Sequence, residues 1–275
     1  MSERACVFID FDGTFAEHGV APREHGEAVL RARANGHTVL LCTGRPASIV
    51  AADVQELFDG LVASAGAHVR VGAELLRDDR FPAELARTTT QLLLEAGATF
   101  ALEAPEAIYC TPDIAAEIQE RVDGGVQEPR GGFGRGPRDI LDAVVLPDDL
   151  TSCSYAKISV WGSPVPVSEI ADRAGELVGA LPNSISDDGM HSGELHLLAI
   201  DKADGIRQVA AHLGVDMAAT VGIGDGMNDV GMLRAAGTGV GIGGSAPAVL
   251  AAADLLVPGP REHGIVAAFS RLGLI

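Results

Sequence analysis

The stretch that most constrains the fold lies near the N-terminus, where an apolar run leads into Asp10-Phe11-Asp12-Gly13-Thr14. A continuous apolar run is typical of a parallel strand that is buried on both faces. Because residues i and i+2 of an extended chain project to the same side, Asp10 and Asp12 should share one pocket. Gly13 allows a sharp turn where the strand ends. Ligands bind at such strand ends in open parallel sheets, so the stretch predicts a functional pocket.

The same alternation of strands and helices occurs before and after a long middle segment. This order predicts a parallel sheet with right-handed crossovers. We therefore expect an α/β fold whose Rossmann-like parallel-sheet core comprises residues 1–81 and 191–275. The expected core strands lie at residues 5–9, 37–41, 60–64, 220–223, 238–241 and 253–257, and the helices at 22–34, 46–58, 202–213, 230–236 and from 247 onward.

The middle segment, residues 82–190, shows a different rhythm and predicts a separate, inserted α+β unit, which the family resemblance described below identifies as a cap domain. Residues 123–137 are rich in glycine and proline and are expected to form an exposed loop. The other expected cap elements are helices at residues 82–96, 112–122 and 167–180, and strands near 98–102, 107–110, 155–161, 183–186 and 194–198, the last beyond the 191 boundary.

Several polar groups fall at the same predicted edge of the core sheet as Asp10 and Asp12. Up to four carboxylates would meet there, and desolvating like charges together costs several kcal/mol unless they are compensated. Mg²⁺ is the natural compensation, because it prefers oxygen ligands and is held by carboxylates plus substrate phosphate. These motifs hold no cysteine or histidine, which argues against zinc. The further groups are Thr43, Gly44, Lys202, Asp225, Asn228 and Asp229.

The uncharged and cationic members of this set suit a phosphate group. Thr43 offers a hydroxyl, its loop, with Gly44, offers backbone N–H groups at a helix start, and Asn228 offers an amide. Lys202 is one of only two lysines, beside Lys157, among the 20 basic residues. In an arginine-rich chain, a lysine indicates a need for a compact point charge. An aspartate beside a metal can act as a nucleophile, and its neighbour can serve as general acid and base.

Charge and composition exclude several classes of function. The formal net charge of −18 disfavours nucleic-acid and anionic-membrane partners, which need clustered positive charge. It does not exclude a small anionic substrate, such as a phosphorylated one, because a metal ion and one lysine can reverse the field locally. The sequence contains no run of the roughly 18 apolar residues that a membrane helix needs. The first strand begins too early to leave room for a signal peptide. The four cysteines show no CxxC spacing, so we expect a cytoplasmic protein without disulfides.

Four motifs together resemble those of the haloacid dehalogenase-like hydrolase superfamily, and their order matches as well. About 160 residues separate the second motif from the third, and an α+β cap in that gap is similar to the Cof-type, class IIB sugar-phosphate phosphatases. The segments Tyr155–Val160 and Glu262–Ile265 also resemble that group. The motifs are Asp10-Phe11-Asp12-Gly13-Thr14, Thr43-Gly44-Arg45, Lys202 and Gly224-Asp225-Gly226-Met227-Asn228-Asp229.

The resemblance implies a role for each residue of the motifs. Asp10 would be the nucleophile and a Mg²⁺ ligand, and Asp12 the general acid and base, binding the metal through its backbone carbonyl. Thr43, Gly44 and Lys202 would hold the phosphoryl group. Asn228 would contact the phosphate or fix its loop. Asp225 would ligate the metal directly, with Asp229 assisting.

The resemblance implies a Mg²⁺-dependent phosphatase for a small phosphorylated metabolite, such as a sugar or polyol phosphate. A phosphotransferase or phosphomutase would need the same motifs. A phospho-acceptor signalling module would also use an acidic pocket with lysine and threonine, but such modules are shorter and lack a cap. Arg45 could reach the substrate or pair with a carboxylate. Ala65-Gly66-Ala67 departs from the family's usual Asn-Gly-Ala.

Overall fold

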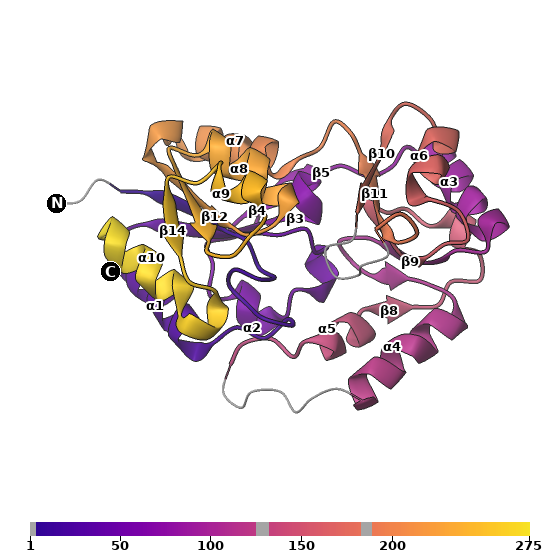
Figure 1. Ribbon diagram of the computed structural model, residues 1–275, viewed down its shortest axis with the longest axis horizontal. Coiled ribbons are helices and arrows are strands. Elements are labelled where there is room, and N and C mark those ends of the chain that lie inside the picture. Colours follow the sequence, from indigo (N-terminus) through magenta and orange to yellow (C-terminus); the bar gives the residue numbers. More distant parts are fainter. Residues whose placement is uncertain (1–3, 125–131, 183–188) are drawn as a thin grey trace.

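Two β-sheets organise the computed structural model, which describes residues 4–124, 132–182 and 189–275. They lie in two halves joined by two chain crossings, with both termini on the larger half (Figure 1). No helix in the described ranges is long and apolar enough to cross a membrane.

The larger sheet has eight strands in the described part of the chain and forms the core. Its first six strands run parallel, and β4 and β5 add an antiparallel hairpin at one edge that the sequence did not predict. In sheet order the strands are β14 (Leu255–Val257), β13 (Thr238–Ile242), β12 (Thr220–Gly224), β1 (Cys6–Ile9), β2 (Thr38–Cys42), β3 (Gly60–Ala63), β4 (His68–Val71) and β5 (Glu74–Asp78).

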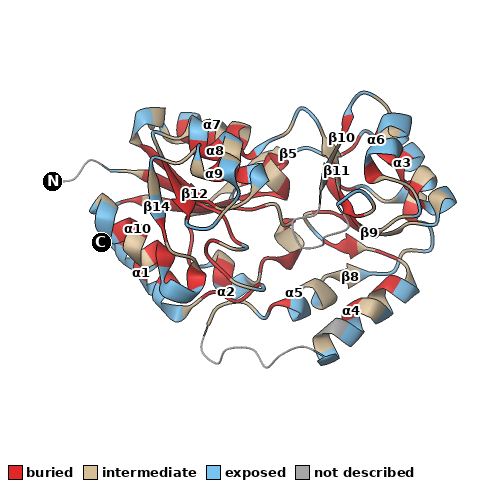
Figure 2. Cartoon of the chain, in the orientation of Figure 1, coloured by how far each residue is buried: buried red, intermediate tan, exposed pale blue. Residues whose placement is uncertain are grey.

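Alternate residues of β1 enter two different hydrophobic clusters, as the period of a strand requires. Val7 and Ile9 pack with helices α1 (Arg23–Ala34) and α10 (Gly264–Leu272). Cys6 and Phe8 pack on the other face with α7 (Lys202–Leu213) and α8 (Val230–Ala235). The central strands are therefore buried on both sides (Figure 2). The shorter core helices are α2 (Ala52–Gln55), α9 (Pro247–Leu250), η1 (Ala47–Ile49), η2 (Ser64–Gly66), η4 (Met217–Ala219), η5 (Met227–Asp229) and η6 (Pro260–Glu262).

The second sheet, here called the cap sheet, has six strands in the described residues. It is antiparallel except for the β7–β8 pair. Helices α3 (Ala83–Ala96) and α6 (Val167–Ala174) cover one face. The strands, in sheet order, are β10 (Val178–Pro182), β11 (Gly193–Leu197), β9 (Lys157–Gly162), β6 (Thr99–Glu103), β7 (Ile108–Tyr109) and β8 (Val144–Val145), and the remaining helices are α4 (Pro112–Gly124), α5 (Pro137–Asp142) and η3 (Leu150–Ser152).

The cap differs from the sequence prediction at its C-terminal end. The helix expected over 167–180 ends at Ala174, because Gly175 adopts a φ of 120° and the chain then enters β10. The strand expected at 183–186 lies outside the described residues. Since β11 pairs with β9 in the cap sheet, the chain returns to the core after Leu197 and not at residue 191 as expected.

Of the loop expected to be exposed over 123–137, residues 125–131 lie outside the described residues, and residues 132–136 reach back to the core. Phe133 pairs with Ala21 through two backbone hydrogen bonds of 2.8 and 3.0 Å. Its ring lies against Gly26 of α1, where an added Cβ would come within 2.2 Å of it. The backbone N–H of Gly134 donates to Asp53 at 3.1 Å. The segment therefore ties the cap to the core on the side opposite the two chain crossings.

Candidate active site

Asp10 stands directly after the buried strand β1, at the edge of the sheet where the parallel strands end. Its backbone N–H donates to the carbonyl of Ile223 in β12 at 2.8 Å, so the neighbouring strand fixes its position. Gly13 then turns the chain with a φ of 84°. A Cβ at Gly13 would lie 2.3 Å from Oδ2 of Asp225. The glycine is therefore needed both for the turn and for the close approach of Asp225.

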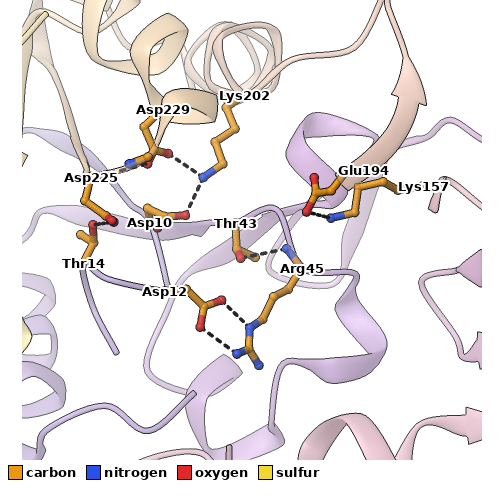
Figure 3. A network of polar contacts seen from close by, with 11 residues as sticks. Asp10, Asp12, Thr14, Thr43, Arg45, Lys157, Glu194, Lys202, Asp225 and Asp229 are labelled. Carbon is orange, nitrogen blue, oxygen red and sulfur yellow. Dashed lines mark hydrogen bonds and ion pairs between the residues drawn. The ribbon is translucent and has the colours of Figure 1, made fainter. Parts of the chain in front are cut away.

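Lys202 joins two of the predicted carboxylates at the start of α7. Its side chain is completely buried, and Nζ donates to Oδ1 of Asp10 at 2.5 Å and to Oδ1 of Asp229 at 2.6 Å (Figure 3). Burial alone would lower the pKa of Lys202, but the two aspartates raise it above its ordinary value. The lysine is therefore a permanently charged ammonium in the centre of the site.

Three carboxylates converge beside this ammonium, with ligand oxygens of Asp10, Asp225 and Asp229 within 4.8 Å of one another. Burial raises the pKa of Asp10 well above its ordinary range, and the charge of Asp229 adds to that effect. Burial also raises the pKa of Asp225, which a hydrogen bond from Thr14 partly offsets. One ammonium does not balance three carboxylates. The oxygen-only donor set and this excess of negative charge fit a hard divalent cation such as Mg²⁺.

The three carboxylates are not equivalent. Oδ2 of Asp229 accepts from the backbone N–H groups of Asp225 and Gly226 at 3.1 and 2.8 Å, while its Oδ1 faces Lys202. Oδ1 of Asp225 accepts from the hydroxyl of Thr14 at 2.6 Å. The oxygens of Asp229 are therefore already engaged in holding the loop, which fits the assisting role expected for it better than direct ligation.

Asp12 is about half exposed and separate from the three converging carboxylates. Nε and Nη2 of Arg45 donate to its two oxygens at 2.6 and 2.7 Å. A two-point contact of this kind fixes the plane of a carboxylate as well as its position. Of the two roles considered for Arg45, the structure contains the pairing with a carboxylate.

The expected phosphate-binding groups surround the same edge of the sheet. Thr43 directly follows β2 and is buried, and its hydroxyl accepts from the backbone N–H of Arg45 at 3.0 Å. A methyl group added at Gly44 would lie 3.3 Å from the amide nitrogen of Asn228. The loops that follow β2 and β12 therefore meet here, and the structure brings the predicted residues of all four motifs to one edge.

A strained turn supports the loop that holds Thr43. Ser64 and Ala65 adopt φ values of 48° and 55°, a left-handed conformation that costs a non-glycine residue energy. Their backbone N–H groups donate to the carbonyls of Arg45 and Thr43 at 2.8 and 3.0 Å. Asparagine, usual in the family where this chain has Ala65, tolerates that conformation better.

Sequence reasoning missed three features of the site. Thr14 was noted only as part of a motif, and its hydrogen bond to Asp225 was not foreseen. The partner of Arg45 could not be read from its spacing. Lys157, the other lysine of the chain, lies on the cap beside the site with Glu194 (Figure 3). The scarcity of lysine was the signal that could have identified it.

Comparisons with known proteins agree with this geometry. Residues 7–269 match the family model for haloacid dehalogenase-like hydrolases. Two Bacillus subtilis proteins, YkrA and YxeH, are 24% and 26% identical to the chain, each over 98% of both sequences. A phosphoglycolate phosphatase from Archaeoglobus fulgidus is 31% identical over 38% of this chain and 46% of its own length.

Solved structures share the whole fold, cap included. The subclass IIB sugar phosphatase BT4131 superposes with a TM-score of 0.77 at 23% identity, covering 98% of this chain and all of that one. The Thermotoga maritima protein TM0651 gives a TM-score of 0.71 at 16% identity, covering 98% and 97%. An α/β core with an acidic edge and an inserted cap thus defines a phosphoryl-transfer type of hydrolase. The chain belongs to the haloacid dehalogenase-like hydrolase family, which confirms the expected fold class and enzyme character.

Proposed function

We propose that this protein is a Mg²⁺-dependent phosphatase that hydrolyses a small phosphorylated metabolite, such as a sugar or polyol phosphate. The observation that carries the proposal is the buried Lys202 ammonium, which joins Asp10 to Asp229 beside Thr43 and Asp225. We call Asp10, Asp225 and Asp229 the acidic trio. The relatives support the proposal, since YkrA and YxeH are both provisionally named phosphatases and another relative is named for phosphoglycolate. The acidic net charge favours a small metabolite over nucleic acid or a membrane.

In the first step, a carboxylate oxygen of Asp10 attacks the phosphorus of the bound substrate. A bond forms between that oxygen and phosphorus, and the bond between phosphorus and the leaving oxygen breaks. Asp12 donates its proton to the leaving oxygen, which departs as an alcohol. The fixed ammonium of Lys202 and the hydroxyl of Thr43 bind the phosphoryl oxygens as charge moves onto them.

In the second step, water hydrolyses the aspartyl-phosphate. Asp12, now deprotonated, takes a proton from the water, whose oxygen attacks phosphorus. The bond between phosphorus and Asp10 breaks, which releases inorganic phosphate and restores both carboxyl groups. Arg45 acts as a positioning residue for the deprotonated form of Asp12, whose two oxygens accept from its N–H groups; the oxygen that carries the proton in the first step must leave this pair.

The acidic trio would hold the metal mainly through Asp10 and Asp225, with the backbone carbonyl of Asp12 completing the protein ligands. A bound Mg²⁺ would neutralise negative charge on the carboxylates and the phosphoryl group.

The cytoplasmic location expected from the sequence stays a prediction. The four cysteines, all free thiols in the structure, are compatible with a reducing compartment.

Phosphate release from an aryl phosphate tests the proposal. Purified wild type with Mg²⁺ is expected to release inorganic phosphate, and chelation with EDTA should stop turnover. Asp10→Asn should abolish turnover while keeping the thermal unfolding transition. The control Asp172→Asn changes an exposed carboxylate on α6 and should keep wild-type activity. Mg²⁺-dependent turnover by Asp10→Asn, or transfer to a second hydroxyl without free phosphate, would contradict the proposal.

A further inference from the structure

Three charged side chains lie on the face of the cap sheet opposite α3 and α6. In β9, Ile158 and Val160 join the hydrophobic cluster under those helices, so Lys157 projects to the other face. The same alternation places Glu103 of β6 and Glu194 of β11 on that face. We call Glu103, Lys157 and Glu194 the cap charge cluster. Lys157 Nζ lies 2.9 Å from Glu194 and 3.2 Å from Glu103.

This cluster reaches the phosphate-binding loop of the core. A methyl group added at Gly44 would lie 3.9 Å from Nζ of Lys157, as well as 3.3 Å from the amide of Asn228. Figure 3 shows Lys157 and Glu194 beside Thr43 and Arg45, entering from the cap side. A phosphate held at the Thr43 loop would therefore present its leaving group to the cluster. No residue of the cluster takes part in the proposed chemical steps.

The charge of Lys157 is already compensated inside the cluster. Its side chain is 4% exposed, and burial would lower its pKa, but the two glutamates raise it, so the ammonium persists. Burial raises the pKa of Glu103. Even a protonated Glu103 leaves Glu194 to balance the ammonium, and an ionised one gives a net negative cluster. In either state the cluster offers no surplus positive charge to a second anionic group.

The cluster and its neighbour His196 nevertheless keep unused hydrogen-bonding groups, both donors and acceptors. Among the described residues, Nδ1 of His196 is buried without a hydrogen-bond partner, and Oε2 of Glu103 contacts no donor other than Lys157 Nζ. His196 stands opposite Lys157 in the β11–β9 register. An ammonium has three N–H donors, and two point at the glutamates. A hydroxyl both donates and accepts, so it can satisfy such a mixed set, whereas a carboxylate or phosphate only accepts.

We propose that the cap charge cluster binds the leaving group of the substrate, and that it selects uncharged polyhydroxylated leaving groups over anionic ones. This inference rests on the proposed phosphatase function and adds its specificity-determining residues. The third N–H of Lys157 donates to one hydroxyl of the leaving group, and Glu103 and Glu194 accept from others. A carboxylate in the same place faces the glutamates and is repelled.

A pair of substrates that differ in one group tests this directly. Glycerol 3-phosphate and 3-phosphoglycerate are alike except that the second carries a carboxylate in place of a hydroxymethyl group. The readout is the ratio of their kcat/KM values, measured by phosphate release in one enzyme preparation. Wild type should prefer glycerol 3-phosphate by at least about tenfold, since like charges at contact distance repel by several kcal/mol.

The variant Glu194→Gln keeps the shape of the side chain and removes one negative charge. It should lower the preference at least about tenfold, because the cluster loses one negative charge and becomes neutral with Glu103 ionised or positive with Glu103 protonated. Glu103→Gln should shift the ratio in the same direction. The control Glu169→Gln alters an exposed carboxylate on α6 of the cap and should leave the ratio unchanged. Because each ratio is internal to one preparation, a partly unfolded variant cannot imitate the result.

The outcomes separate the inference from the proposed function. Equal kcat/KM values for the two substrates in wild type, or an unchanged ratio in both Glu194→Gln and Glu103→Gln, would overturn the inference while leaving a working phosphatase. Absence of phosphate release from both substrates and from an aryl phosphate would overturn the proposed function itself. A preference that shifts in the glutamine variants and not in Glu169→Gln supports the inference.

Discussion

Replacing Lys202 with methionine tests how the centre of the site is held together. The side chain is fully buried and donates two hydrogen bonds to carboxylates, at 2.5 and 2.6 Å. A hydrogen bond to a charged group contributes about 1.5–3 kcal/mol, and removing one partner of a buried ion pair costs about 3–5 kcal/mol. Methionine fills most of the lysine volume, so little of the loss comes from a cavity. We expect Lys202→Met to lower the free energy of unfolding by about 3–5 kcal/mol.

Urea denaturation in EDTA measures this loss without interference from a metal. Arg207→Met is the matched control, because Arg207 lies on the same helix in an exposed pair with Asp204. Its effect should stay within about 0.5 kcal/mol. The double variant Lys202→Met with Asp10→Asn should be more stable than the sum of the single changes predicts, because it removes one of the two uncompensated carboxylates. A loss below about 1 kcal/mol for Lys202→Met, or strict additivity, would refute this reasoning.

Three further predictions concern pH, strain and the phosphate loop. His25 is buried, with Nδ1 donating to the Phe15 carbonyl at 2.8 Å, and burial lowers its pKa from 6.5 to about 4. The unfolded state therefore takes up the proton first, so the free energy of unfolding falls as the pH drops below 6.5. The loss at pH 5 should be about 2 kcal/mol. Urea unfolding measures it, and the variant His25→Gln should not show it. Ala65→Gly should stabilise the protein by about 1 kcal/mol in thermal unfolding, since it relieves a left-handed alanine, whereas Ala96→Gly in α3 should destabilise it. Thr43→Val should lower kcat/KM about 10- to 100-fold through loss of the hydroxyl, with Thr38→Val as an unaffected control in the same phosphate-release assay.

The core and its chemical groups could be predicted from the sequence because both depend on short-range patterns. An apolar run ending in Asp10 and Asp12 identifies a buried strand end, and parallel strands bring their ends to one edge. Lys202 could be placed because the first core rhythm resumes there. The family resemblance supplied the roles and the cap, and the match over residues 7–269 confirms that family.

The parts that could not be predicted depend on contacts between distant residues. Nothing local shows that residues 193–197 pair with β9, so the return to the core was placed too early. The ring of Phe133 packs against Gly26, about a hundred residues earlier in the chain. Because no local pattern shows this contact, the glycine-rich segment was predicted to be exposed. The pairing of Arg45 with Asp12 joins two loops of the core sheet, and the cap charge cluster joins three strands of the cap sheet, so neither is visible in a local pattern.

The central claim is that Asp10 becomes phosphorylated during turnover. Acid quenching of the enzyme during steady-state turnover of an aryl phosphate with Mg²⁺, followed by borohydride, would reduce an acyl phosphate at this position to homoserine. Peptide mass spectrometry then identifies the modified residue. We predict homoserine at position 10 in samples quenched with substrate and none in samples without it. An unmodified Asp10 in an enzyme that is turning over substrate, or reduction at another carboxylate, would contradict the account.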